Sequence, residues 1–146
     1  MEHIDLDLYL KQATTFRFVN EAAFSDEDGG VIRSSYRYVG DEVFFAGHFP
    51  GEPIVPGVIL VESMAQSCRA WLNWRLGKKA GGFIVSIDRV KLSKPVRPGD
   101  VVDMQAKPLS VLDDSATSPR FCRFTCTSMC NDEEVAKTSM TLYQSV

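Results

Sequence analysis

The sequence predicts an α+β fold in which one long buried helix packs against a curved antiparallel sheet of about six strands. Two observations support this prediction. A single apolar segment, residues 58–76, runs without glycine or proline. Strand-like segments lie on both sides of it and are separated by turns rich in glycine, proline and aspartate. Because 146 residues is about the size of one domain, we treat residues 1–146 as a single domain.

The helix prediction depends on spacing. Apolar side chains recur every three or four residues and cover most of the circumference: Val58, Val61, Ala65, Cys68 and Leu72, widened by Ile59, Leu60, Met64 and Trp71. Pro56 and Gly57 stand at its start, where helical N–H groups have no partner, and Gly77 ends it. Such a helix should be largely buried.

The strands follow from alternation and turn chemistry. Residues 14–25 and 31–39 predict a hairpin, after a short amphipathic helix at residues 5–11. Later strands are expected at residues 82–93, 101–112, 120–130 and 135–144, in an antiparallel meander that curls around the helix. A sheet wrapped on one helix leaves edge strands exposed, and dimerisation is a common way to cover them.

Composition and charge exclude several classes of function. Hydrophobic residues make up 45% of the chain, charged residues 24%, and the net charge is −3. Nothing therefore predicts general affinity for nucleic acid or for an anionic membrane. No apolar run approaches the ~20 residues of a membrane span, and the first residues lack the pattern of a signal peptide. We expect a cytoplasmic protein without membrane insertion.

Three of the four cysteines share the segment "CRFTCTSMC", whose regular spacing suggests a metal or cluster site. On a strand, Cys122, Cys126 and Cys130 would point to one face with neighbours ~13 Å apart. That separation is too large for a shared zinc ion or a disulfide. We therefore predict reduced, buried core residues and no metal site.

The candidate chemistry lies in "GHFPGEPIVPGVILVESMAQ", residues 47–66. His48 could be a turn histidine bonded to the backbone, and Glu62 could be a solvated helix residue. Glu62, however, lies among apolar neighbours, so it needs a partner or a raised pKa. A histidine and a carboxylate facing one apolar cavity form a base and acid pair, and the helix N-terminus at Gly57 could polarise a carbonyl. These parts suit proton abstraction α to a thioester carbonyl with loss of a β-hydroxyl.

This segment closely resembles the signature of the β-hydroxyacyl-acyl-carrier-protein dehydratases of the FabZ/FabA type. "IDRVKLSKPVRPGD", residues 87–100, resembles the second landmark of that family. The resemblance implies a hotdog fold and a homodimer with active sites at the interface, with a trimer of dimers left open. It also implies no cofactor beyond the phosphopantetheine of an acyl carrier protein, which carries the substrate.

The resemblance also implies roles for individual residues. His48 matches the catalytic histidine, Glu62 the acidic partner from the other subunit, and Gly57 the amide that holds the thioester carbonyl. Glutamate at the acidic position favours plain dehydration without isomerisation, giving a trans-2-enoyl thioester from a (3R)-3-hydroxyacyl thioester. We further expect strand residues 83–85, Phe83, Ile84 and Val85, to line the acyl tunnel.

Two features leave the biological role open. The N-terminal segment "QATTFRFVNEAAFS" lacks the family's usual Pro-His and Val-Asp-Arg, so a specialised polyketide or polyene-lipid pathway is as plausible as primary fatty-acid synthesis. Basic residues near the helix end and the second landmark form either a docking surface for an acidic carrier protein or an ordinary solvated face. They are Lys78, Lys79, Arg89, Lys91, Lys94 and Arg97, with Lys94 and Arg97 the strongest docking candidates.

Two rival interpretations remain. The same fold supports acyl thioesterases, which place a carboxylate on the helix but generally lack the paired "GHFPG" and "PGV" segments. The chain could also be a non-catalytic partner subunit of a dehydratase heterodimer, although the intact His48 and Glu62 argue against this.

Overall fold

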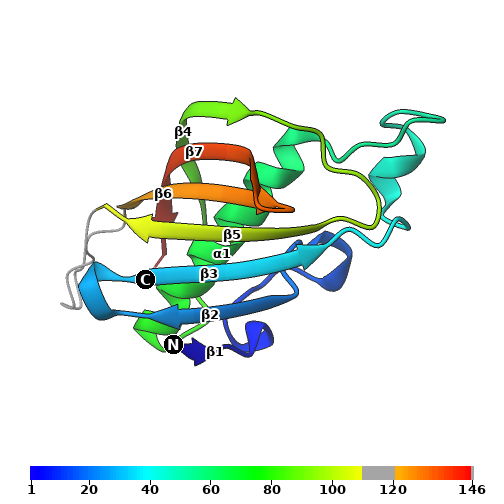
Figure 1. The fold of residues 1–146 in the computed structure, drawn as a ribbon. Helices are drawn as coiled ribbons and strands as arrows, with labels where there is room; N and C mark the ends of the chain where they lie inside the picture. Colours follow the sequence, from blue (N-terminus) through cyan, green and yellow to red (C-terminus); the bar gives the residue numbers. More distant parts are fainter. Residues whose placement is uncertain (110–120, 146) are drawn as a thin grey trace.

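The computed structural model, which describes residues 1–109 and 121–145, has one long helix packed on one face of a seven-stranded antiparallel sheet (Figure 1). The strands are β1 (Glu2–His3), β2 (Glu21–Ser25), β3 (Val31–Arg37), β4 (Gly82–Leu92), β5 (Val101–Pro108), β6 (Phe121–Cys130) and β7 (Glu133–Gln144), and the helix is α1 (Gly57–Leu76). Four short 3-10 segments are η1 (Leu6–Leu8), η2 (Thr14–Phe16), η3 (Glu27–Gly29) and η4 (Val43–Ala46). The sheet order is β1-β2-β3-β5-β6-β7-β4. The predicted α+β hotdog architecture is confirmed.

The predicted β2–β3 hairpin and the β5–β6–β7 meander are both present. The position of β4 differs from a simple meander, because among the described strands β4 pairs only with β7, while β5 pairs with β3 and β6. The chain therefore passes from one edge of the sheet to its centre between β4 and β5, and β4 remains an edge strand.

The first predicted strand is shorter than expected. Only residues 21–25 are extended in the sheet, and residues 14–16 form η2. The reason lies in helix α1, where the buried Gln66 side chain accepts a hydrogen bond from Phe18 N (2.8 Å) and donates one to Phe16 O (2.9 Å). This backbone therefore bonds to a helix side chain instead of a neighbouring strand.

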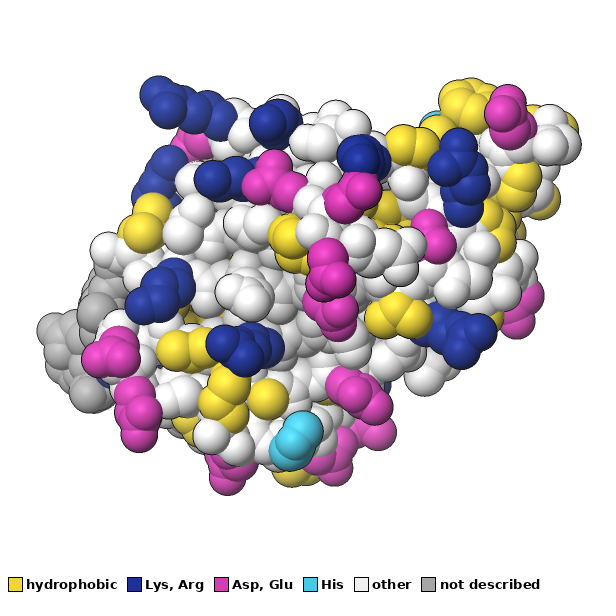
Figure 2. All heavy atoms as spheres, viewed as in Figure 1, with side chains coloured by type: hydrophobic (Ala, Val, Ile, Leu, Met, Phe, Trp, Pro, Cys, Tyr) yellow, Lys and Arg dark blue, Asp and Glu magenta, His cyan; other side chains and the backbone are white. Residues whose placement is uncertain are grey.

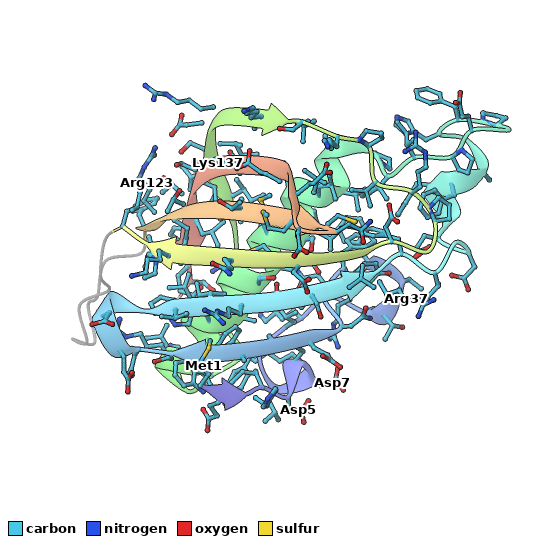
Figure 3. The ribbon with its side chains drawn as sticks, viewed as in Figure 1. Met1, Asp5, Asp7, Arg37, Arg123 and Lys137 are labelled. Carbon is cyan, nitrogen blue, oxygen red and sulfur yellow. The ribbon has the colours of Figure 1, made fainter. Side chains whose placement is uncertain are left out.

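The N-terminal segment is likewise less regular than predicted. In place of a helix over residues 5–11 there is the single turn η1, which Asp5 caps by accepting a hydrogen bond from Asp7 N (3.1 Å). Asp7 in turn forms an ion pair with Arg17, so it ties η1 to the segment after η2. Figure 3 shows Asp5 and Asp7 at this end of the molecule.

Helix α1 begins and ends close to the predicted positions. Pro56 precedes its first turn, and Gly77 ends it in the left-handed conformation (φ 69°), with its N–H bonded to carbonyls of the last turn. From Leu60 to Asn73 the helix is almost wholly buried. Val58, predicted to lie on the buried stripe, is instead 74% exposed.

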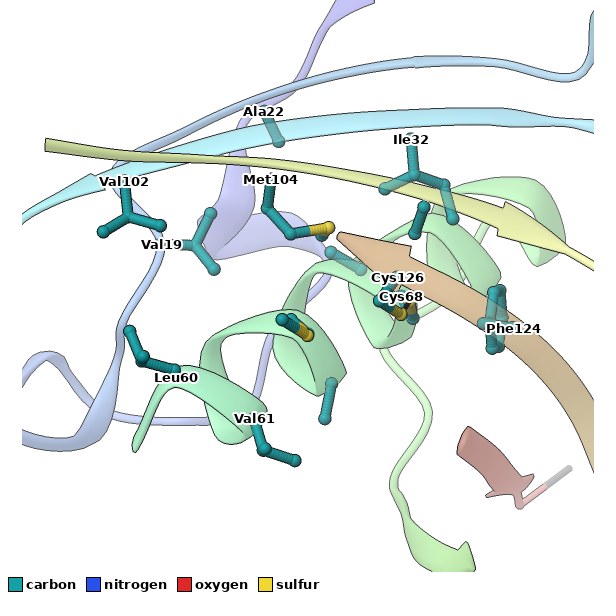
Figure 4. Close-up of a cluster of buried hydrophobic side chains, with 14 of the residues drawn as sticks. Val19, Ala22, Ile32, Leu60, Val61, Cys68, Val102, Met104, Phe124 and Cys126 are labelled. Carbon is teal, nitrogen blue, oxygen red and sulfur yellow. Dashed lines mark hydrogen bonds between the residues drawn. The ribbon is translucent and has the colours of Figure 1, made fainter. Parts of the chain in front are cut away.

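The core lies between α1 and the concave face of the sheet (Figure 4). All four cysteines are buried and free, as the strand interpretation predicts. Cys68 of α1 lies against Cys126 of β6, with their sulfur atoms 3.7 Å apart. Burial raises the pKa of the Cys68 thiol, so this thiol stays protonated and packs as an apolar group.

The other face of the sheet is polar. Arg123 and Lys137 project from it (Figure 3), and Arg123 Nη1 donates to Asp88 Oδ2 of β4 at 2.7 Å. Among the described residues, no helix is long and apolar enough to cross a membrane.

Candidate active site

His48 lies in the loop between η4 and α1, which extends away from the body of the sheet (Figure 1). The loop folds on itself because Ile54 N donates to His48 O (2.9 Å) and Glu52 N donates to Phe49 O (3.0 Å). Val55 N donates to Val96 O (2.7 Å), which anchors the loop to the segment between β4 and β5. The two landmark segments of the sequence therefore lie side by side.

The protonation of the His48 ring follows from its contact with the backbone. Nδ1 lies 3.2 Å from Ile54 O, and a carbonyl oxygen can only accept a hydrogen bond. Nδ1 therefore carries the proton in the neutral ring, and Nε2 keeps its lone pair. The ring stacks on Phe49 with centroids 4.3 Å apart, so its orientation is held on two sides. This is the arrangement that a general base requires.

Gly57 opens helix α1 and lines a cavity of about 260 Å³ together with His48, Lys94 and Val96. The N–H groups of the first helical turn have no intrahelical acceptor and carry the positive end of the helix dipole. A Cβ at Gly57 would lie 2.3 Å from Leu92 Cδ1, so close packing against β4 is the structural reason for glycine here. Imidazole and helix N-terminus thus share one cavity.

Glu62 lies on the second turn of α1 and is half-buried. Burial raises the pKa of its carboxyl above the ordinary value of 4.5, and the hydrogen bond from Gln66 Nε2 to Glu62 Oε1 (3.0 Å) partly opposes that rise. The expectation that this carboxylate needs a partner or a raised pKa is confirmed on both counts. A carboxyl whose pKa is raised is suited to hold and deliver a proton.

A second cavity, of about 240 Å³, lies beside Glu62. Phe83 and Ile84 of β4 line it, whereas Val85 is not among its lining residues and is 47% exposed. The remaining walls come from α1, from the N-terminal segment and from β7, as Gln12, Ala65, Gln66, Arg69, Gly82 and Leu142.

Within one protomer, His48 and Glu62 line different cavities. The structure thus brings His48 together with Gly57, and Glu62 together with Phe83 and Ile84. It does not bring the two halves into one cavity within a single chain.

The predicted basic residues are all exposed, and one of them lies at the site. Lys94 lines the His48 cavity and forms an ion pair with Glu133. Arg97 uses its backbone N–H to bond Asp100 Oδ2 (2.9 Å) in the turn before β5. In Figure 2, basic side chains lie along the edge that β4 forms, with acidic side chains among them, so no uniform basic face is present in this view.

Two polar residues of α1 were missed in the sequence interpretation. Gln66 bonds Glu62, and Arg69 lines the cavity beside it. The sequence contains a pattern that could have identified them. Polar residues recur at helical spacing along this otherwise apolar segment, as Glu62, Gln66, Arg69 and Asn73. Among residues 1–109 and 121–145, no group of three or more histidine, cysteine or acidic residues has a geometry that could hold a metal ion.

A curved antiparallel sheet wrapped around one long helix is a hotdog fold. In this chain the loop before the helix carries His48, and the helix carries Glu62. The FabA-like domain model matches residues 10–139, and the chain belongs to that family. The resemblance stated from the sequence is thus confirmed.

Named relatives are 3-hydroxyacyl-[acyl-carrier-protein] dehydratases FabZ. The one from Wolbachia sp. subsp. Brugia malayi is 36% identical over 107 residues, covering 68% of this chain and 67% of the relative. The one from Wolbachia sp. subsp. Drosophila simulans is 34% identical over 118 residues, covering 78% and 76%. For the Caulobacter vibrioides relative, 40% identity extends over 72 residues, which is 45% of its length.

Solved structures agree on the fold. The dehydratase heterocomplex ApeI:P from Xenorhabdus doucetiae matches with a TM-score of 0.79 at 18% identity, covering 98% of this chain and 92% of that one. A putative thioesterase, yhdA from Lactococcus lactis, matches with a TM-score of 0.66 at 12% identity, covering 87% and 92%. At these identities the likeness supports the fold alone.

Proposed function

We propose that the chain dehydrates (3R)-3-hydroxyacyl thioesters on an acyl carrier protein to trans-2-enoyl thioesters, in fatty-acid or related lipid or polyketide biosynthesis. The observation that carries this proposal is that one side chain can accept a proton and another can donate one. The His48 ring keeps a lone pair on Nε2, and the Glu62 carboxyl has a raised pKa. One group is prepared to take a proton and the other to give one.

The reaction requires both groups at one substrate. His48 Nε2 removes the α-proton, and the N–H of Gly57 stabilises the thioester oxygen as it gains negative charge. The Cβ–O bond breaks as Glu62 of the partner subunit protonates the leaving hydroxyl, so water departs and the Cα–Cβ double bond forms. Transfer of the proton from the imidazolium to the carboxylate then restores the starting state.

The partner in this scheme is a second copy of the chain, joined through β4. This edge strand is 11 residues long and pairs only with β7 among the described strands. Its exposed apolar side chains include Phe83, Val85, Ile87, Val90 and Leu92. A long apolar edge is a template for pairing with another chain, so a homodimer would cover it. Further association into a trimer of dimers would use other surfaces.

An acyl carrier protein would deliver the substrate on its phosphopantetheine arm. Exposed Lys94 lines the His48 cavity, and exposed Arg97 follows in the same segment, so both are placed to meet acidic side chains of a carrier protein. No cofactor enters the proposed reaction, since His48 and Glu62 carry every proton transfer and the Gly57 amide stabilises the thioester oxygen. We place the protein in the cytoplasm, where carrier-bound intermediates are made.

The proposal is tested by incubating the pure protein with a 3-hydroxyacyl-carrier substrate and following products by mass. Loss of one water indicates dehydration, free acid indicates the thioesterase alternative, and no product indicates a subunit that needs a different partner. His48→Ala should abolish turnover, while Glu52→Gln, a change in the same loop, should leave it nearly intact. Full activity of a folded His48→Ala variant would rule out the proposed base.

A further inference from the structure

Arg69 is a buried cation that the proposed dehydration does not use. It lies on α1 two turns beyond Glu62, on the same helix face, and is only 7% exposed. Burial lowers the pKa of its guanidinium to about 10, which leaves it charged at neutral pH. The charge therefore has to be stabilised by its surroundings.

Its protein partners are neutral. Nη1 donates to Gln144 Oε1, and Nη2 donates to Tyr143 O at 2.5 Å. Among the described residues, no carboxylate forms an ion pair with Arg69. A guanidinium has five N–H donors, so these two acceptors leave donors over.

The position of the guanidinium is fixed by its neighbours. A Cβ on Gly82 would lie 2.5 Å from Arg69 Nη2, so the group packs directly against the backbone of β4. Gln144 Nε2 donates to Asn73 Oδ1 (2.5 Å), and Asn73 Nδ2 donates to Tyr9 O (2.7 Å). This chain of hydrogen bonds holds the charge in place at the wall of the cavity.

The cavity beside Glu62 is small, and its lining contains both polar and apolar side chains. Its volume of about 240 Å³ lies below the ~300–1,000 Å³ typical of ligand pockets. Gln12 lines it together with Arg69, and Gln12 Oε1 is buried without a hydrogen-bond partner among the described residues. Apolar side chains of Phe83, Ile84 and Leu142 thus share this cavity with a cation and an unpaired amide oxygen.

We propose that Arg69 determines substrate specificity, so that the site prefers acyl groups ending in a carboxylate or another hydrogen-bond acceptor over alkyl chains of the same length. This inference rests on the proposed function of the same site. An alkyl chain that filled the cavity would remove water from the spare N–H donors and leave them unpaired. A terminal acceptor would replace that water with a charge-assisted hydrogen bond. For acyl groups too short to reach the guanidinium, the site should show no preference between the two kinds of terminus.

The distance to be spanned sets the test substrates. Glu62 and Arg69 are about 10 Å apart along the helix axis at ~1.5 Å per residue, and helical side chains lean toward the N-terminus. A four-carbon chain should stop short of Arg69, whereas six- and eight-carbon chains cover the range of its reach. At six and at eight carbons, a pair of pantetheine thioesters that differ only in a methyl or a carboxylate terminus isolates the effect of the terminal group.

The experiment compares kcat/KM of the wild-type homodimer for the two members of each pair, with 3-hydroxybutanoyl-pantetheine as the reference. We expect a preference of about tenfold or more for the carboxylate at one of the two lengths. Arg69→Met, which keeps the reach of the side chain without its charge, should reverse that preference. Arg69→Lys should retain part of it.

The readouts separate this inference from the proposed function. Absence of turnover on the four-carbon substrate would contradict the dehydratase activity alone. Equilibrium binding of the unreactive saturated thioesters, hexanoyl- and adipoyl-pantetheine with their eight-carbon counterparts, would still report on Arg69. Equal or better binding and turnover of the alkyl member at both lengths in wild-type protein overturns the inference, even if Arg69→Met fails to fold.

Discussion

Gln66→Leu tests whether the hydrogen bonds of one side chain couple the N-terminal segment to the Glu62 carboxylate. Gln66 is 1% exposed and makes three contacts, with Phe18 N, Phe16 O and Glu62 Oε1. Leucine would keep the apolar volume and remove every one of them. The buried Phe18 N would then lack an acceptor, at a cost of about 1–3 kcal/mol. The half-buried Phe16 O would lose a donor, at a cost of about 0.5–1.5 kcal/mol.

The free energy of unfolding should therefore fall by about 1.5–4.5 kcal/mol in urea titrations. Gln105→Leu, at an exposed position of β5, is the matched control and should change it by less than about 0.5 kcal/mol. Gln66→Leu also removes the hydrogen bond that lowers the pKa of Glu62. That pKa should therefore rise, and the alkaline limb of the pH–activity profile should move to higher pH. The coupling would be refuted if the free energy of unfolding fell no more than in the control and the pH–activity profile stayed unchanged.

The remaining predictions concern Glu62, the β4 edge and the helix end. Because the pKa of Glu62 is raised in the folded state, its ionised form destabilises that state. Glu62→Gln should therefore increase the free energy of unfolding at pH 7–8, with the gain vanishing as the pH falls below the ordinary value of 4.5, and a gain that is constant with pH would contradict this. Val85→Lys should shift sedimentation toward monomer, since charge on an edge strand opposes pairing, and an unchanged dimer would place the interface elsewhere. Gly77→Ala should cost about 1 kcal/mol because Gly77 is left-handed, whereas Gly47→Ala, at a negative φ, should cost nothing.

Local patterns in the sequence were sufficient for the long helix and most strands. Residues 58–76 predicted α1 to within one residue, because helical spacing, an N-terminal Pro-Gly pair and a terminal glycine agree. The location of β4 at the sheet edge was not predictable in this way, since strand order depends on contacts between segments distant in sequence.

The irregular N-terminal segment has a similar cause. Residues 14–18 have the apolar and β-branched composition of a strand, yet their backbone bonds to Gln66. A polar residue on a buried helix needs partners, but the sequence does not say which backbone supplies them.

The candidate site was predictable in part. His48 and Glu62 were selected from the sequence, and the structure adds the free Nε2 of one and the hydrogen-bond partner of the other. The cavity that Arg69 and Gln12 close was not foreseen, because helical spacing places Arg69 in line with Glu62 but does not show that both line the same cavity.

The proposed dehydration requires His48 of one subunit to act with Glu62 of another. Mixing the inactive variants His48→Ala and Glu62→Gln under conditions of subunit exchange tests this most directly. Half of the dimers in an equal mixture would be mixed, and each would hold one intact site, so activity should recover to about a quarter of the wild-type value. If mass measurements confirm mixed dimers and activity stays absent, the two residues do not act across the interface.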